Sequence, residues 1–246
     1  MSINLGEWLM SRVVLVTGAN RGIGREIVQQ VVDAGDVALL GARDVDRARD
    51  AADAVEQVAA AADRKGQVEV VPLDVTDQAS VDAAARQVDG QHGRLDVLVN
   101  NAAIHYDTWQ RGIDADLGVV EEAFQTNVLG AWRVAEAFVP LLLRAPSPRL
   151  VNVSSGSGSL ASMGSGTPAY AVTKAALNAL TRVLAGDLRS RGVLVNAVCP
   201  GWTATDMGGA GGRPVAEGAA SVMWAVNLSD DGPTGGFFRD GRPVPW

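Results

Sequence analysis

Short apolar runs alternate along the chain with longer segments that mix alanine and polar residues. The runs that are rich in β-branched residues lie at 13–17, 37–42, 68–73, 95–100, 149–154 and 193–199. Between them, segments such as 45–62, 79–89 and 170–189 are long enough to form helices. Strands that are apolar on both faces and are separated by helices predict a parallel sheet covered on both sides. We therefore expect one α/β domain over residues 11–246, preceded by an N-terminal extension at 1–10.

Composition and charge fit such a domain and exclude one class of partner. The chain has 246 residues, of which 47% are apolar and 20% are charged, as in an ordinary globular protein. The formal net charge is −7, and lysines and arginines form no stripe along the sequence. Because phosphate backbones require concentrated positive charge, we expect no nucleic-acid partner.

The sequence also argues against secretion, membrane insertion and a metal centre. The first ten residues contain neither a basic segment nor an apolar core, unlike a signal peptide. The longest apolar stretch is interrupted by Arg133, Glu136 and Pro140, which argues against a membrane span. The single cysteine, Cys199, cannot close an internal disulfide, and two histidines argue against a zinc site. We expect a cytoplasmic protein without a metal ion or a membrane partner.

The first predicted strand runs directly into a glycine-rich turn, TGANRGIG, at 17–24. A plain strand-to-helix turn is one interpretation. The order strand, glycine turn, helix and second strand is, however, the context of a dinucleotide-binding fingerprint. Gly18 permits the tight turn, while Gly22 and Gly24 let a pyrophosphate and the sheet approach the helix start, whose free amides bind phosphate. The turn therefore predicts a nucleotide site.

A second motif, YAVTK at 170–174, combines one of two tyrosines with one of two lysines. Tyr170 and Lys174 are spaced i and i+4, so both side chains share one face of a helix. A nearby ammonium favours the phenolate and lowers the pKa of a tyrosine from about 10, which suits acid–base chemistry. The alternative is a core tyrosine beside a lysine that reaches solvent. After a nucleotide fingerprint, we favour a catalytic pair.

Two flexible stretches follow predicted strands. They are SSGSGSLASMGSG at 154–166 and GGAGGRP at 208–214. Loops in this position lie at the carboxyl edge of the sheet, where open parallel sheets bind ligands.

Taken in order, the motifs of this chain resemble those of the classical short-chain dehydrogenases/reductases. The series is TGANRGIG, LDV (73–75), NNAA (100–103), TNV (126–128), VNVSS (151–155), YAVTK and CPGWTATDM (199–207). It covers essentially the whole chain. The segment CPGWTATDMGG and the C-terminal sequence are most similar to those of carbonyl-reductase members. The resemblance implies a single doubly wound Rossmann domain, with about seven strands, that reduces a ketone or aldehyde to an alcohol.

The resemblance also implies four catalytic roles. Tyr170 is the general acid, and Lys174 lowers its pKa and binds the nicotinamide ribose. Ser155 holds the substrate oxygen, and Asn127 keeps a proton-relay water beside the lysine. Other serines of the same loop compete with Ser155 for its role, namely Ser154, Ser157 and Ser159.

NADP(H) is expected in preference to NAD(H). Ala42 stands where an NAD enzyme of the family has an acidic residue, and Arg43 and Arg21 occupy positions from which basic residues bind the 2′-phosphate. Asp44 adds a competing negative charge. The full set of expected cofactor residues is Gly18, Asn20, Arg21, Gly22, Ile23, Gly24, Arg43, Asp74, Val75, Asn101, Ala102, Tyr170, Lys174, Pro200, Gly201 and Thr205.

Several positions allow two interpretations. Asp74 either contacts the adenine ring or caps the segment that follows it. Ala103 replaces a family glycine, which is costly only if its φ is positive or its backbone makes a close approach. His105 either lines the substrate site or is a polar loop residue, which we favour. Cys199 is expected to be a buried strand-end residue. Two further residues, Trp202 and Met207, either contact an apolar substrate or fill the core.

Two other functions remain open at this point. One is a reductase of carrier-bound 3-oxoacyl groups, which has the same four catalytic residues. The other is a non-catalytic dinucleotide-sensing regulator, against which the complete catalytic set argues. We expect a small-molecule carbonyl substrate and a homodimer or homotetramer, formed through the helices around 123–143 and 170–189.

Overall fold

The computed structural model describes residues 11–246, and the extension expected at 1–10 lies outside the described residues. One sheet contains eight strands in the order β3-β2-β1-β4-β5-β6-β7-β8. The strands are β1 (Val13–Thr17), β2 (Val37–Ala42), β3 (Gln67–Pro72), β4 (Val97–Asn100), β5 (Arg149–Val153), β6 (Leu194–Val198), β7 (Phe237–Arg239) and β8 (Arg242–Pro243). Only β8 is antiparallel to its neighbour. The doubly wound parallel sheet predicted from the sequence is confirmed.

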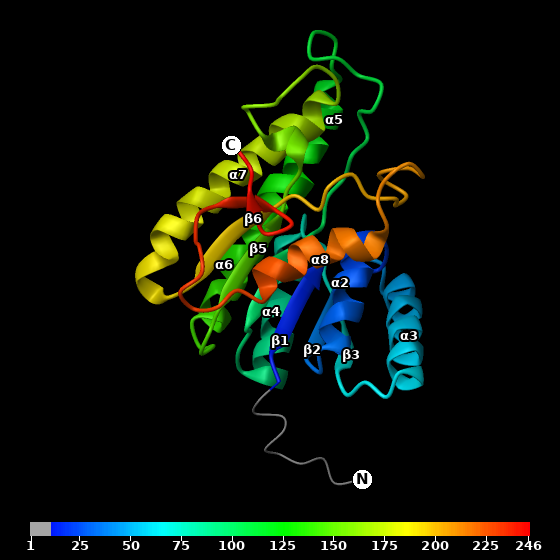
Figure 1. Cartoon of the computed structure of the whole chain (residues 1–246), viewed down its shortest axis with the longest axis vertical. Helices are drawn as coiled ribbons and strands as arrows, with labels where there is room; N and C mark the ends of the chain where they lie inside the picture. Colours follow the sequence, from blue (N-terminus) through cyan, green and yellow to red (C-terminus); the bar gives the residue numbers. More distant parts are fainter. Residues whose placement is uncertain (1–10) are drawn as a thin grey trace.

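Helices cover both faces of this sheet (Figure 1). They are α2 (Gly22–Asp33), α3 (Val45–Ala61), α4 (Gln78–His92), α5 (Leu117–Phe124), α6 (Ala131–Leu142), α7 (Pro168–Leu188) and α8 (Val215–Val226). Three short helical segments are η1 (Gln125–Gly130), η2 (Gly156–Gly158) and η3 (Arg189–Arg191). Successive β1 residues point to opposite sides, so Leu15 packs with α4, α6 and α7, whereas Val14 packs with α2, α3 and α8.

Aspartates at helix starts explain why several helices begin where they do. Asp44, Asp77 and Asp116 cap α3, α4 and α5 by accepting a hydrogen bond from a backbone N–H of the first turn. The helix α7 is different, because its N-cap residue, Thr167, has a φ of 44° and makes no side-chain cap. Its first turn is therefore stabilised from elsewhere in the fold.

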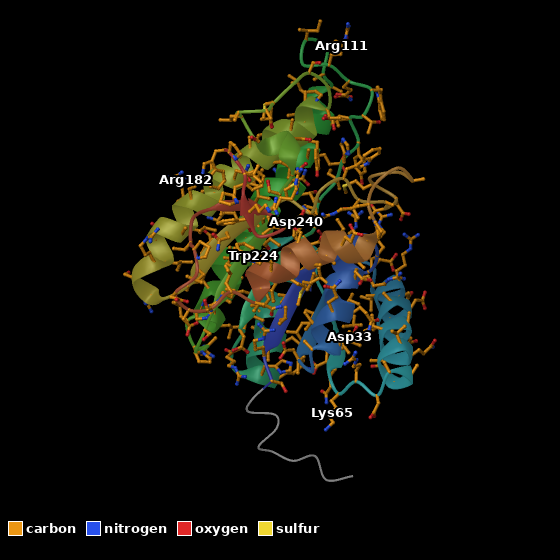
Figure 2. The ribbon with its side chains drawn as sticks, viewed as in Figure 1. Asp33, Lys65, Arg111, Arg182, Trp224 and Asp240 are labelled. Carbon is orange, nitrogen blue, oxygen red and sulfur yellow. The ribbon has the colours of Figure 1, made fainter. Side chains whose placement is uncertain are left out.

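The two lysines lie in different parts of the molecule. Lys174 is buried within α7. Lys65 lies in the turn between α3 and β3, at the end of the molecule opposite to the loop of Arg111 (Figure 2).

Within residues 11–246, no helix combines the length and the apolar character that crossing a membrane requires.

Candidate active site

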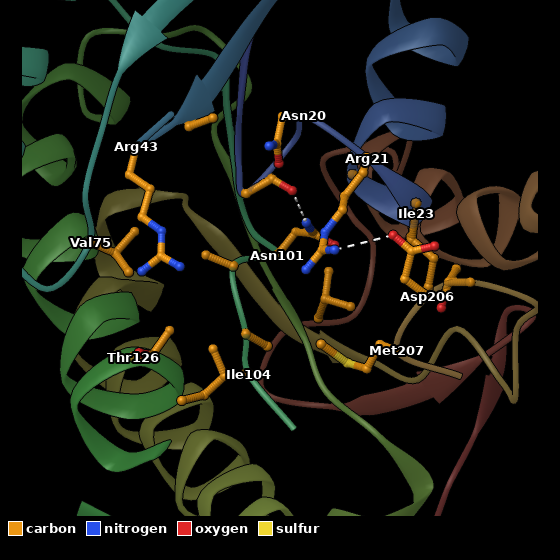
Figure 3. A pocket seen from close by; sticks show the side chains of 18 of the residues that line it. Asn20, Arg21, Ile23, Arg43, Val75, Asn101, Ile104, Thr126, Asp206 and Met207 are labelled. Atoms are coloured by element: carbon orange, nitrogen blue, oxygen red, sulfur yellow. Dashed lines mark hydrogen bonds and ion pairs between the residues drawn. The ribbon is translucent and has the colours of Figure 1, made fainter. Parts of the chain in front are cut away.

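A cavity of about 310 Å³ opens at the carboxyl edge of the sheet. The glycine-rich turn, the ends of β2, β3 and β4, the start of α7 and the loop after β6 all contribute to its wall (Figure 3). Every residue expected at the cofactor site lines this cavity except Gly201. The sequence motifs therefore meet at one place, and the volume suits a small-molecule site.

The glycine turn brings backbone close to backbone. Gly18 has a φ of 63°, and a Cβ there would lie 2.8 Å from the Cα of Ala102. A Cβ on Gly24 would lie 2.5 Å from Nδ2, the side-chain amide nitrogen of Asn101. This side-chain amide donates hydrogen bonds to the backbone oxygens of Thr17 (2.8 Å) and Gly18 (3.2 Å), which fixes the turn.

The start of α2 fits a diphosphate group. Its N-cap residue, Arg21, makes no side-chain cap, and the first turn contains no acidic residue. The N–H groups of this turn are thus not covered by a capping side chain, and the helix dipole adds positive potential there.

Arginines border the part of the cavity beside β2. Arg43 is exposed and points into the cavity next to Val75 (Figure 3). Arg21 instead donates to Asp206 across the opening, at 3.1 Å. Asp44 is engaged by Arg47, through the backbone N–H at 3.1 Å and the guanidinium at 3.3 Å. The competing negative charge of Asp44 is thus partly neutralised beside Arg43.

Arg47 also lines the cavity, although it belongs to none of the motifs recognised in the sequence. Its spacing from Arg43 is i and i+4 on the chain that enters α3. That spacing is the signal that could have found it.

Tyr170 and Lys174 lie together in the cavity wall, as their spacing predicts. The Lys174 ammonium lies 5.6 Å from the centroid of the Tyr170 ring and donates to the backbone oxygen of Val153 at 2.8 Å. Burial lowers the pKa of Lys174 to about 8. This buried ammonium has one hydrogen-bond partner of its own and faces the phenol.

Burial also dominates at the tyrosine. The pKa of Tyr170 is raised to about 12: burial raises it most, the Ser155 hydrogen bond lowers it, and electrostatic interaction with Cys199 and Asp107 also raises it. The spacing of Tyr170 and Lys174 predicted that the ammonium would lower this pKa, but the pKa is raised. The reason is that removal of the phenolate from water outweighs the nearby ammonium. The phenol is therefore protonated at neutral pH.

Of the serines in the loop after β5, Ser155 is the one that contacts the phenol. Its hydroxyl hydrogen-bonds the Tyr170 side chain and accepts from the N–H of Ser157 at 3.2 Å. Ser154 lines the cavity, but its hydroxyl donates to Asn178 at 2.6 Å. Ser159 donates to the backbone oxygen of Pro245 at 2.7 Å. The hydrogen bonds thus favour Ser155 over its competitors.

Asn127 lies outside the cavity wall, in the π-helical turn η1. Its side chain accepts from the N–H of Ile104 (2.8 Å) and donates to the oxygens of Ile104 (3.0 Å) and Thr173 (3.0 Å). Both of its N–H donors are therefore used within the protein. Through them, Asn127 links Ile104, in the loop after β4, to Thr173 of α7. Its role in holding a relay water stays a prediction.

Two of the open positions are now better defined. The Asp74 carboxylate accepts from the N–H (2.9 Å) and hydroxyl (2.7 Å) of Thr76, so it caps a turn while also lining the cavity. Ala103 is not among the residues with positive φ, so alanine causes no backbone strain there.

His105 lies in the loop after β4 and is not among the residues that line the cavity. Its imidazole is nevertheless mostly buried, and the ring centroids of His105 and Tyr170 are 4.3 Å apart. This contact with the phenol was not expected from the sequence. Cys199 is buried as expected, and its sulfur accepts from Arg239 at 3.0 Å, a basic neighbour that is distant in sequence.

Trp202 and Met207 do not fill the core, because they are 67% and 41% exposed, and Met207 lines the cavity. Tyr106 and Ile104 line the cavity from the β4 loop. The mouth is therefore partly apolar.

Comparison with known proteins agrees with this geometry. The sequence model of the family described as short chain dehydrogenase matches residues 12–213. The (+)-neomenthol dehydrogenase of Arabidopsis thaliana is 34% identical, over 92% of this chain and 95% of its own. Among solved structures, the NADPH-bound carbonyl reductase from chicken fatty liver has 31% identity and a TM-score of 0.84, covering 96% of this chain and 99% of that one. A putative short chain dehydrogenase from Escherichia coli CFT073, complexed with NADPH, has 26% identity and a TM-score of 0.82, covering 92% and 95%.

Proposed function

Because the chain belongs to the short-chain dehydrogenase family, whose members are oxidoreductases, we propose that it reduces a ketone or aldehyde to an alcohol with NADPH. The observation that carries this proposal is the contact of Tyr170, which lines the cavity beside the glycine turn, with Ser155 and Lys174. A ring hydroxyl that is protonated at neutral pH suits a proton donor better than a base.

Some residues of the cavity would bind the cofactor, and others would bind the carbonyl oxygen and transfer the proton. The glycine turn and the α2 amides would hold the diphosphate, and Arg43 would pair with the 2′-phosphate. When bound, NADPH would supply the hydride. Ser155 and Tyr170 would hold the carbonyl oxygen by hydrogen bonds, and Tyr170 would donate its hydroxyl proton to that oxygen as negative charge develops. The Lys174 ammonium would stabilise the phenolate that remains.

We propose that the enzyme prefers NADPH to NADH because of the charged residues at the end of β2. Arg43 makes no ion pair with any other residue of the described chain, and Ala42 offers no carboxylate to a ribose. The chicken and Escherichia coli relatives were both solved with NADPH. The alternative of a carrier-bound 3-oxoacyl substrate has no observation in its favour beyond the shared catalytic residues.

The direct test is NADPH consumption with a panel of carbonyl compounds. Cyclohexanone, p-nitrobenzaldehyde and larger apolar ketones would be supplied, and nicotinamide absorbance would be followed with NADPH and with NADH. We expect consumption with at least one carbonyl and faster consumption of NADPH. A panel without any turnover would contradict the proposed function.

The reduction rate is expected to fall as pH rises through about 8. The pKa of Lys174 is about 8, lower than its usual value, so the ammonium loses its proton there while Tyr170 is still protonated. Without that charge the phenolate is less stabilised, so proton donation slows. A kcat profile over pH measures this, and Lys174→Arg is expected to remove the loss. A profile that stays flat until pH approaches that of tyrosine ionisation would contradict it.

Self-association is proposed through α6 and α7. Their surfaces expose Trp132, Val172 and Val183 by 41%, 48% and 55%. Light scattering at micromolar concentration should therefore give a mass above the 25.5 kDa of one chain. Val183→Arg should lower that mass, whereas Val58→Arg, at a valine of α3 that is 53% exposed, should not. A 25.5 kDa species alone would contradict the proposal.

A further inference from the structure

Asp107 holds the first turn of the helix that carries Tyr170. Its side chain is 1% exposed, and its Oδ2 accepts from the backbone N–H of Ala169 (2.7 Å) and of Tyr170 (3.3 Å). The local N-cap residue, Thr167, provides no side-chain cap. Asp107, in the loop after β4, therefore caps the start of α7. Asp77 caps α4 in the same way, but as the residue directly before that helix.

His105 connects the same carboxylate to the phenol ring. Its ring lies against the Tyr170 ring with an interplanar angle of 30°. Its Nε2 lies 3.8 Å from Oδ1 of Asp107, and both atoms are buried without a hydrogen-bond partner among residues 11–246. Buried polar atoms without partners are uncommon, and hydrogen bonds at active sites often shorten only when ligands are bound.

Resting on the proposed role of Tyr170 as proton donor, we propose that Asp107 and His105 are positioning residues for it. Asp107 fixes the backbone of Tyr170, and the imidazole fixes the plane of the phenol ring. Between them, the two side chains leave the hydroxyl free to face Ser155 and the cavity.

The pair also sets the charge around the phenol. The groups facing Tyr170 are Ser155, Lys174, Cys199, Asp107 and His105. Burial lowers the pKa of His105, Asp107 raises it and Lys174 lowers it. A neutral imidazole does not cancel the Asp107 charge, which adds to the larger effect of burial in opposing formation of the phenolate.

Three variants separate positioning from a general effect on folding. Asp107→Ala removes cap and charge, and Asp107→Asn keeps an acceptor oxygen and removes the charge. Asp77→Ala removes an equivalent cap from α4, a helix that carries none of the proposed catalytic residues. Asp107→Ala is expected to lower kcat by roughly 10- to 100-fold through misplacement of the phenol, with little change in the Kd of NADPH. Asp77→Ala should leave kcat unchanged. Equal kcat values for the two alanine variants would overturn the proposal.

Two substitutions at His105 test whether a flat ring at this position holds the phenol ring of Tyr170. His105→Phe keeps a flat ring against Tyr170, and His105→Ala does not. Turnover is expected to fall in the alanine variant and to recover in the phenylalanine variant. A phenylalanine variant as impaired as the alanine variant would overturn the ring-positioning role. This comparison tests the ring-positioning role even if Asp107→Ala does not fold, and Asp107→Asn then tests the role of the carboxylate.

The charge effect has a readout that does not depend on catalysis. The chain has two tyrosines, so in a Tyr106→Phe background the absorbance of tyrosinate reports Tyr170 alone. Adding Asp107→Asn should move the tyrosinate transition to lower pH, because a charge that opposes the phenolate is removed. An unmoved transition would contradict the proposal.

The outcomes distinguish this proposal from the one it rests on. If no carbonyl compound is consumed, the proposed function fails; if Tyr170→Phe retains normal turnover, its proton-donor role fails, whatever the Asp107 variants do. If Tyr170→Phe loses turnover and the Asp107 and His105 variants do not, only the positioning pair fails. Asp107→Ala should also add little to the loss in Tyr170→Phe, because residues that act through one group are not additive.

Discussion

Tyr170→Phe is expected to lower the turnover of NADPH-dependent carbonyl reduction by about 10²–10⁴-fold, the usual contribution of a general acid. The ring and its packing against His105 stay, and only the hydroxyl that contacts Ser155 is removed. The phenol is protonated at neutral pH because its pKa is about 12, so the wild-type enzyme has the donor ready. The Kd of NADPH should change little, since the glycine turn and the arginines are untouched.

The other tyrosine provides a matched control. Tyr106 lines the same cavity, and Tyr106→Phe removes a hydroxyl there without removing the proposed proton donor. Rapid-mixing measurements of single turnovers would show the chemical step directly. Equal losses in the two variants would mean that the Tyr170 hydroxyl has no special part in the reaction.

Arg43→Ala is expected to weaken NADPH binding by about 10- to 100-fold and NADH binding much less. The guanidinium has no ion-pair partner in the described chain, so the phosphate would not have to displace a carboxylate from it. NADH carries no 2′-phosphate, so loss of the arginine removes nothing comparable from it. The preference for NADPH should therefore narrow or reverse.

Titrations of both cofactors with the variant measure this effect. Arg49→Ala is the matched control, because Arg49 is an exposed arginine of α3 that pairs with Asp46 and does not line the cavity. Similar losses of the two cofactors in Arg43→Ala would show that Arg43 does not bind the 2′-phosphate.

The sheet and the cofactor turn could be predicted because their signals are local. The run at 13–17 and the glycines that follow it determine a strand, a turn and a helix start within a few residues, and the structure has β1 and α2 there. Tyr170 and Lys174 are similarly one helical turn apart. The comparisons confirm the family that these motifs indicated.

Contacts across long sequence distances could not be predicted. Asp107 caps a helix 62 residues away, Arg239 reaches Cys199 across 40 residues, and Arg21 pairs with Asp206 across 185. Nothing in the local pattern at these positions marks a partner, because the fold alone brings them together. The same limit explains the tyrosine, whose pKa depends on an enclosure that a motif does not describe.

Deuterium transfer tests the central claim most directly. The wild-type protein would be incubated with NADPH that carries deuterium at both transferable positions of the nicotinamide, together with a carbonyl compound that the panel shows to be consumed. Mass spectrometry and NMR of the alcohol would locate the label. We predict one deuterium on the former carbonyl carbon of each alcohol molecule, and a yield of labelled alcohol per unit time that falls in Tyr170→Phe in proportion to turnover. An alcohol without deuterium, or an undiminished yield of labelled alcohol in Tyr170→Phe, would contradict hydride transfer with Tyr170 as the proton donor.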